Sequence, residues 1–187
     1  MIPVVDIVKS MRYELKDMQG TKISDFELIE AINQAASLLY GRLSDRYIHV
    51  GLKKHVFSVG TTGSTALPVD FVRVYQVFDS DGNLLVPTTG NTSVTGAYRV
   101  MNDTFFAPTG SYNLEYYYTP LRVTSLADNL DIPNSLRPYI EQLSIIMHNG
   151  ELARAEEIIL VLSHNLGGNE LSHYPDAMVQ NVTGGKV

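Results

Sequence analysis

The chain has 187 residues, of which 44% are hydrophobic and 18% charged, a composition typical of a folded protein with a core of ordinary size. Its formal net charge of −6 argues against non-specific binding to nucleic acid or to an anionic membrane, because both repel an acidic protein at long range. Since the chain contains no cysteine, disulfides, thiolate catalysis and cysteine-ligated metal centres are excluded.

Two helices are expected in the first 45 residues. In the first, apolar residues recur at helical spacing up to Met18, and Gly20 is expected to cap the helix end: Val4, Val8, Met11, Leu15 and Met18. The second is predicted to begin with a capping box formed by Ser24 and Glu27. Its apolar stripe then continues for about five turns: Leu28, Ile32, Ala35, Leu39 and Leu43.

From residue 54 to residue 124 the apolar period changes to two and turn residues recur, which predicts an antiparallel β unit. Asp81-Gly82 and Asn102-Asp103 are the expected hairpin turns. In "YNLEYYYT" (112–119), alternation places four apolar side chains on one strand face: Tyr112, Leu114, Tyr116 and Tyr118. We interpret this face as buried, and we expect Tyr117 to point outward. Glu115, in place of Lys or Arg, argues against a stacking platform for nucleic acid.

Two further helices are predicted after the β unit. Ser135 is the expected N-cap of the first, and Pro138 falls within its first turn. Asn149-Gly150 is expected to end this helix, and Gly167-Gly168 to end the next. Because their connection is short, the two helices should pack antiparallel.

These elements predict an α+β protein: an antiparallel four-helix body, made of two helices, a β insertion and two helices, with an extended C-terminal arm. The expected divisions are 1–53 with 125–168 for the helical body, 54–124 for the β subdomain, and 169–187 for an extended or disordered arm. No apolar run approaches the ~20 residues of a membrane span, and the N-terminus lacks a signal-peptide pattern, so we expect no membrane contact.

No motif in the sequence predicts catalysis or metal binding. The run "DSDGN" (79–83) begins like a calcium loop, but Leu84 and Gly90 stand where an EF-hand needs glycine and glutamate. The five histidines form no HExxH pair, and no strained G-x-S-x-G turn is present. We therefore expect no enzyme activity, no cofactor and no metal.

The order of four motifs resembles the head-to-tail adaptor (connector, or head-completion) proteins of tailed bacteriophages, especially the adaptors and tubular tail proteins of short-tailed phages. The motifs are the capped helix "SDFELIEAINQAASLLYGRL" (24–43), Leu67-Pro68-x-Asp70-Phe71, Tyr116-Tyr117-Tyr118-x-Pro120 and Leu130-Asp131-Ile132-Pro133. The resemblance extends from about Ile23 to Leu166, and it rests on the order and spacing of these motifs.

The resemblance implies a structural virion protein at the head–tail junction, assembled in the host cytoplasm. It would form a ring, commonly of about twelve copies, between the portal and the tail or nozzle protein. DNA would pass through its channel without sequence-specific binding. The arm would bind the portal or a neighbouring copy through Tyr174, Pro175, Met178, Val179 and Val182. The β hairpin with Asp79, Asp81, Gly82 and Asn83 would face the tail.

A different class of function also fits the sequence. The β subdomain could hold a pocket of a small cytoplasmic ligand- or peptide-binding protein, lined by Tyr75, Phe105, Phe106 and Tyr117. The mass of the assembled particle separates the two alternatives, because only the adaptor is expected to form a ring.

Overall fold

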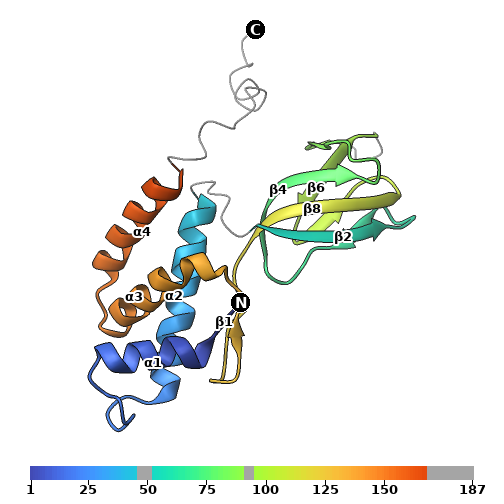
Figure 1. Cartoon of the computed structure of the whole chain (residues 1–187). Helices are drawn as coiled ribbons and strands as arrows, with labels where there is room; N and C mark the ends of the chain where they lie inside the picture. Colours follow the sequence, from blue (N-terminus) through green and yellow to red (C-terminus); the bar gives the residue numbers. More distant parts are fainter. Residues whose placement is uncertain (46–51, 91–94, 168–187) are drawn as a thin grey trace.

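The computed structural model describes residues 1–45, 52–90 and 95–167. The chain forms two parts that lie side by side, a helical part and a β domain inserted between its second and third helices (Figure 1). The protein is therefore α+β, as expected. None of the helices in the described ranges is long and apolar enough to cross a membrane.

The helical part contains the four α-helices of the described chain: α1 (Val4–Glu14), α2 (Asp25–Asp45), α3 (Arg137–His148) and α4 (Leu152–Gly167). A 3-10 turn, η1 (Asn134–Leu136), leads into α3. Two short strands, β1 (Ile2–Pro3) and β9 (Asn129–Leu130), form an antiparallel ribbon beside the helices. The core between them is aliphatic and includes fully buried Ile7, Leu39 and Ile140.

The expected antiparallel four-helix body is wrong. Only α2, with 21 residues, is long, and α1 has just 11. In Figure 1, α1 and α3 cross the axis of α2 instead of running along it, and the β1–β9 ribbon occupies space beside them. Strands in three sheets make up much of the rest of the described chain. Helices of such unequal length cannot share one apolar seam from end to end.

Two helix ends differ from the sequence expectation. The first helix ends at Glu14, because Lys16 adopts the left-handed conformation (φ 54°) and the N–H of Asp17 bonds the Arg12 carbonyl, as in a Schellman motif. Met18 is consequently 68% exposed. Ser135 does not cap α3, since it lies inside η1, and α3 has no side-chain cap.

The β domain is made of two sheets that pack against each other. The first has the order β2 (Lys53–Val59), β8 (Gly110–Tyr118) and β4 (Phe71–Asp79). The second has the order β3 (Ser64–Ala66), β7 (Thr104–Phe106), β6 (Ala97–Met101) and β5 (Val86–Pro87). All pairs are antiparallel except the parallel pair of β5 with β6. Phe105 of the second sheet is fully buried and packs edge-on against Phe57 of the first.

The tyrosine-rich strand β8 lies at the centre of the first sheet. Tyr112, Leu114, Tyr116 and Tyr118 are buried, as predicted from the alternation. The prediction for Tyr117 is wrong, because its ring is only 5% exposed. Tyr117 packs edge-on against Tyr75 and under the guanidinium of Arg73, so both faces of the strand are covered at this end.

Both predicted turns return the chain antiparallel to the strand before them, but the hairpins differ in length. Asn102 and Asp103 both have positive φ, as in a type I′ turn, and join β6 to β7 in the expected hairpin. The chain after the Asp81-Gly82 turn also folds back antiparallel on β4, with a bridge between Phe78 and Leu84 and a hydrogen bond from the Leu85 N–H to the Val77 carbonyl (2.8 Å). Beyond Leu85 the chain leaves β4, and β5 pairs with β6 in parallel.

Candidate functional site at the domain junction

Three of the motifs found in the sequence meet where the β domain joins the helical part. Asp70 precedes β4, Tyr116 and Tyr118 end β8, and Asp131 follows β9. Lys53, the first residue of β2, and Tyr40 of α2 complete the group. We call this group the junction cluster: Tyr40, Lys53, Asp70, Tyr116, Tyr118 and Asp131.

Lys53 connects the two parts of the molecule electrostatically. Its Nζ lies 2.6 Å from Oδ2 of Asp70 in the β domain and 2.5 Å from Oδ2 of Asp131 beside the helices. The ammonium also lies 4.2 Å from the centre of the Tyr118 ring, a cation–π distance. Burial disfavours the charged form of Lys53, but the hydrogen bonds and charges of Asp131 and Asp70 outweigh it, so the pKa of Lys53 is raised.

The tyrosine hydroxyls close the network around this lysine. The Tyr116 hydroxyl donates to Oδ1 of Asp70 (3.0 Å), and the Tyr118 hydroxyl donates to the Asp131 carbonyl (2.8 Å). Because the Tyr118 proton is used there, Tyr40 donates to Tyr118 across the junction, over 3.2 Å. Burial and the bond to Asp70 raise the pKa of Tyr116 to about 12. Burial likewise raises the pKa values of Tyr40 and Tyr118.

A second set of contacts fixes the returning linker after β8. The side-chain amide of Asn33 on α2 donates to the Val123 carbonyl and accepts from the Val123 N–H, both over 2.9 Å. Both residues are buried. Arg122 pairs with Glu30 on the same helix, and Arg73 of β4 donates to the Ser44 hydroxyl over 3.0 Å. The linker and the β domain are therefore both attached to α2.

The chemistry of the junction cluster favours a positioning role. Its lysine and two carboxylates neutralise one another in part, and the raised pKa values of its three tyrosine hydroxyls move them further from ionisation at neutral pH. A general base or nucleophile needs a pKa near the working pH. The arrangement instead fixes the orientation of the β domain relative to α2.

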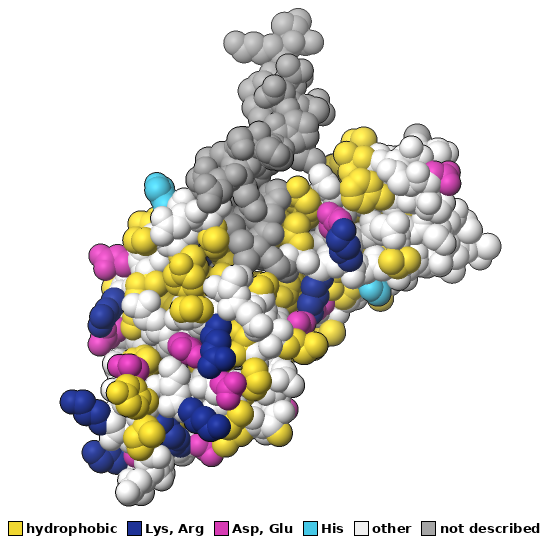
Figure 2. Space-filling view, in the orientation of Figure 1, with side chains coloured by type: hydrophobic (Ala, Val, Ile, Leu, Met, Phe, Trp, Pro, Cys, Tyr) yellow, Lys and Arg dark blue, Asp and Glu magenta, His cyan; other side chains and the backbone are white. Residues whose placement is uncertain are grey.

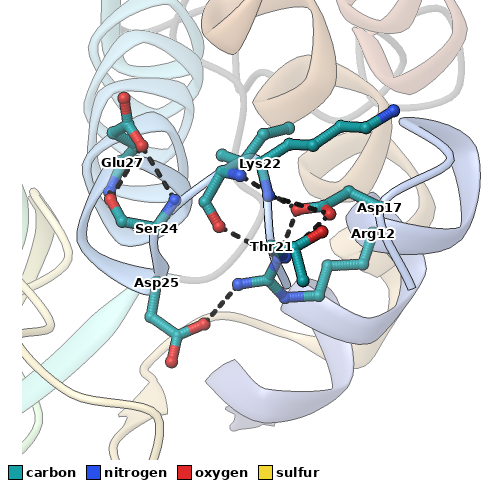
Figure 3. Close-up of polar contacts among 8 residues, drawn as sticks. Arg12, Asp17, Thr21, Lys22, Ser24, Asp25 and Glu27 are labelled. Carbon is teal, nitrogen blue, oxygen red and sulfur yellow. Dashed lines mark hydrogen bonds and ion pairs between the residues drawn. The ribbon is translucent and has the colours of Figure 1, made fainter. Parts of the chain in front are cut away.

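The loop between α1 and α2 is organised by one buried carboxylate (Figure 3). Asp17 accepts backbone N–H bonds from Thr21, Lys22 and Ile23 over 3.0 to 3.2 Å. Arg12 lies 2.8 Å from Asp17 and donates to Asp25 as well. Burial of Asp17 opposes its ionisation, but these N–H bonds and the charge of Arg12 outweigh it, so its pKa is lowered. All of these groups stabilise the loop itself.

The α2 helix begins at this loop as the sequence predicts. The Ser24 N–H donates to the Glu27 carboxylate (2.8 Å), and the Glu27 N–H donates to the Ser24 hydroxyl (3.3 Å). This reciprocal pair confirms the capping box.

The predicted tail-facing hairpin lies at the end of the β domain away from the junction. One carboxylate oxygen of Asp79 accepts from the N–H groups of Asp81 (3.0 Å) and Asn83 (2.8 Å), and Gly82 has φ +82°. The hydrogen bonds from Asn83, together with those from the backbone of Asp81 and Gly82, lower the pKa of Asp79. Asp81, Gly82 and Asn83 are exposed. The predicted arm residues, Tyr174, Pro175, Met178, Val179 and Val182, lie outside the described residues.

The pocket expected from the sequence is not formed by the residues suggested for it. Phe105 is fully buried and Tyr117 is 5% exposed, so these rings belong to the core. An open groove of about 610 Å³ lies elsewhere on the same domain, between β4 and β6. We call it the β4–β6 groove, and its lining consists of Phe71–Val74, Pro87–Thr89 and Tyr98–Met101.

The part that Lys53 and Tyr40 play in the junction cluster could not be inferred from sequence motifs. Lys53 stands at the start of an amphipathic strand, where a lysine is normally solvated. Tyr40 lies next to the apolar stripe of α2 and carries no motif of its own. Their contacts exist only because the fold brings Asp70, Asp131 and Tyr118 together, with Lys53 between the two aspartates and Tyr40 bonded to Tyr118.

No protein-family model matches the sequence, and no curated protein shows significant similarity to it.

Proposed function

We propose that this protein is a structural virion component, a head-to-tail adaptor that forms a ring between the portal and the tail or nozzle of a bacteriophage. The observation that carries the proposal is the junction cluster. The motifs that resemble those of phage adaptors are far apart in the sequence, yet Asp70, Tyr116 and Asp131 share one network through Lys53. Such a network supports the idea that these motifs form one functional unit.

The architecture is compatible with this role. A ring subunit needs one part that builds the ring body and another at a fixed angle to it, and the junction cluster fixes such an angle here. The net charge of −6 suits a channel through which DNA moves without adhering, because acidic walls repel phosphates. In the view of Figure 2, basic and acidic side chains are interspersed over the helical part, with no large basic patch on that face.

In this proposal the protein acts at the head–tail junction of the virion and has no catalytic role. Its partners are other copies of itself, the portal protein and a tail or nozzle protein. Asp79, Asp81, Gly82 and Asn83 would face the tail, because they lie at the end of the β domain away from the helical part.

A mass measurement tests the proposal. The full chain is studied by native mass spectrometry and electron microscopy, alone and mixed with the portal protein of the same phage. We expect closed rings of about twelve copies that dock on the portal. A chain that stays monomeric in both conditions would contradict the proposal.

The alternative function is a ligand- or peptide-binding protein, and the β4–β6 groove is the observation that favours it. This groove has a volume within the range of small-molecule sites. A monomer that binds a metabolite or a short peptide with a changed thermal midpoint would support the alternative instead.

A further inference from the structure

We propose that the β4–β6 groove binds residues 176–182 of a second copy of this chain as an added β-strand. The inference deepens the proposed function and rests on it in one respect, that copies of the chain assemble. It names the contact between neighbouring copies and assigns the arm to a neighbour.

Both walls of the groove are strand edges that lack a strand partner in the described ranges. β4 is the outer strand of its sheet, and its first half, Phe71–Val74, forms one wall. On the other wall, β5 covers β6 only at Ala97 and Tyr98, which leaves the outer edge of Arg99–Met101 open. Open edges present unpaired N–H and C=O groups, and an extended peptide satisfies them by strand addition.

The groove combines an apolar lining with two arginine side chains, Arg73 and Arg99. Val72 is 44% exposed and Met101 is 48% exposed on its walls, and Tyr98 is buried beneath them. Figure 2 shows hydrophobic side chains on the part of the domain where β4 and β6 lie in Figure 1. Arg99 stacks over Phe106, and its Nε is buried without a hydrogen-bond acceptor among the described residues. An occupant with apolar side chains and a carboxylate would match these properties.

Residues 176–182 have this composition in strand spacing. In "DAMVQNV", the period of two places Asp176, Met178, Gln180 and Val182 on one face of a strand. The carboxylate can pair with Arg99 while Met178 and Val182 contact the apolar lining. Pro175 precedes this segment and Gly184 follows it, and both residue types are typical of strand ends.

The segment is long enough to reach a neighbour. The helix α4 ends at Gly167, and the nine residues from there to Asp176 can span up to about 30 Å when extended. The arm and the groove are two different surfaces, so their contact is heterologous, the kind of contact that generates a ring.

Disulfide trapping tests the contact in the full chain, which has no cysteine of its own. Val72→Cys is introduced in one copy and Met178→Cys in a second, size-tagged copy, and the mixture is oxidised alone and with the portal. Val56→Cys, on β2 at the other edge of the same sheet and 72% exposed, replaces Val72→Cys in the matched control. We expect at least about tenfold more cross-linked pairs with Val72→Cys, because docking raises the effective concentration of the thiols.

The outcomes separate this inference from the proposed function. Equal yields with Val72→Cys and Val56→Cys, in both conditions, would overturn the groove contact. A chain that carries both Val72→Cys and Met178→Cys should form covalent multimers, and an internal disulfide within single chains would overturn the second-copy assignment. Ring formation is measured on the unmodified chain in parallel. Rings without selective cross-linking defeat only the groove contact, whereas the absence of rings defeats the proposed function.

Discussion

The two ends of the β domain use an aspartate in opposite ways. At the junction, Asp70 is 9% exposed and bonds to Lys53 and Tyr116, which are 17 and 46 residues away in the sequence. At the far end, the carboxylate of Asp79 accepts hydrogen bonds, among the described residues, only from residues within four positions of itself, such as Asp81 and Asn83. The first carboxylate joins distant segments, and the second shapes one exposed turn.

This difference indicates which carboxylates determine the tertiary structure. A buried ion pair costs desolvation on both partners, so its loss leaves an uncompensated charge. An exposed turn exchanges its lost hydrogen bonds for bonds with water. Substitutions at the two ends should therefore have very different effects on stability.

The largest effect is expected for Asp70→Ala. The change removes one of the two carboxylates of Lys53 and leaves the buried Tyr116 hydroxyl without its acceptor. We expect a loss of about 3 kcal/mol in the free energy of unfolding, measured by urea denaturation. In the matched variant Asp131→Ala, the lost carboxylate is 43% exposed, so the loss should be clearly smaller. Equal losses would contradict the importance of burial at Asp70.

The linker contact of Asn33 is expected to rank next. Asn33→Ala leaves the buried N–H and C=O of Val123 without partners, which should cost about 2 kcal/mol. Gln34→Ala is the control, because Gln34 is the exposed neighbour on α2. Amide hydrogen exchange at Val123 provides the direct measurement, and unchanged protection would argue against the contact.

The third prediction concerns the stability of the fold at low pH. The pKa values of Asp17, Asp79 and Asp128 are all lowered in the folded protein. At Asp17, burial has the opposite effect on the pKa but is outweighed by backbone hydrogen bonds and by the charge of Arg12. At Asp79 the main cause of the lowered pKa is the side-chain hydrogen bond from Asn83, and at Asp128 it is the backbone hydrogen bonds from Thr124 and Ser125. A lowered pKa contributes stability above the pKa of the unfolded chain and loses it as the pH falls through the folded pKa. Stability should therefore decrease below about pH 4. Asp17→Asn should flatten this decrease in urea titrations between pH 5 and pH 2, and a slope that does not change would contradict the assignment.

The smallest effect is expected for Asp79→Ala. The lost hydrogen bonds lie in an exposed turn, so the urea midpoint should shift less than in Asp70→Ala or Asn33→Ala. Gly82→Ala is a useful companion, since φ +82° at residue 82 strains any side chain and should lower the midpoint more than Asp79→Ala does. A shift of the urea midpoint by Asp79→Ala as large as that of Asp70→Ala would mean that the turn also contacts residues outside itself.

Local elements were predictable from the sequence, and long-range contacts were not. The capping box of Ser24 and the Gly150 helix end depend on neighbouring residues, and both are confirmed. The early end of α1 was missed because Lys16, and not a glycine, takes the left-handed conformation. The outward placement of Tyr117 failed because Arg73 and Tyr75 of the neighbouring strand cover it.

The candidate site shows the same division. The aspartates and tyrosines of the junction cluster stood out as motif residues, but their meeting point depends on Lys53 and on the topology of the inserted domain. The helix arrangement was also beyond the sequence, because apolar stripes predict which face of a helix is buried and not the angle at which two helices cross.

The position at which the β domain is inserted into the helical part has a consequence for the evolution of the chain by gain or loss of domains. Lys53 opens the domain and pairs in register with Tyr116, two residues before its last strand ends. The two ends of the insert are thus direct neighbours, so a short peptide can bridge them with little loop-closure cost. The insert therefore meets the geometric condition for gain or exchange of a whole domain, with the junction cluster as the set of contacts that a replacement would have to restore.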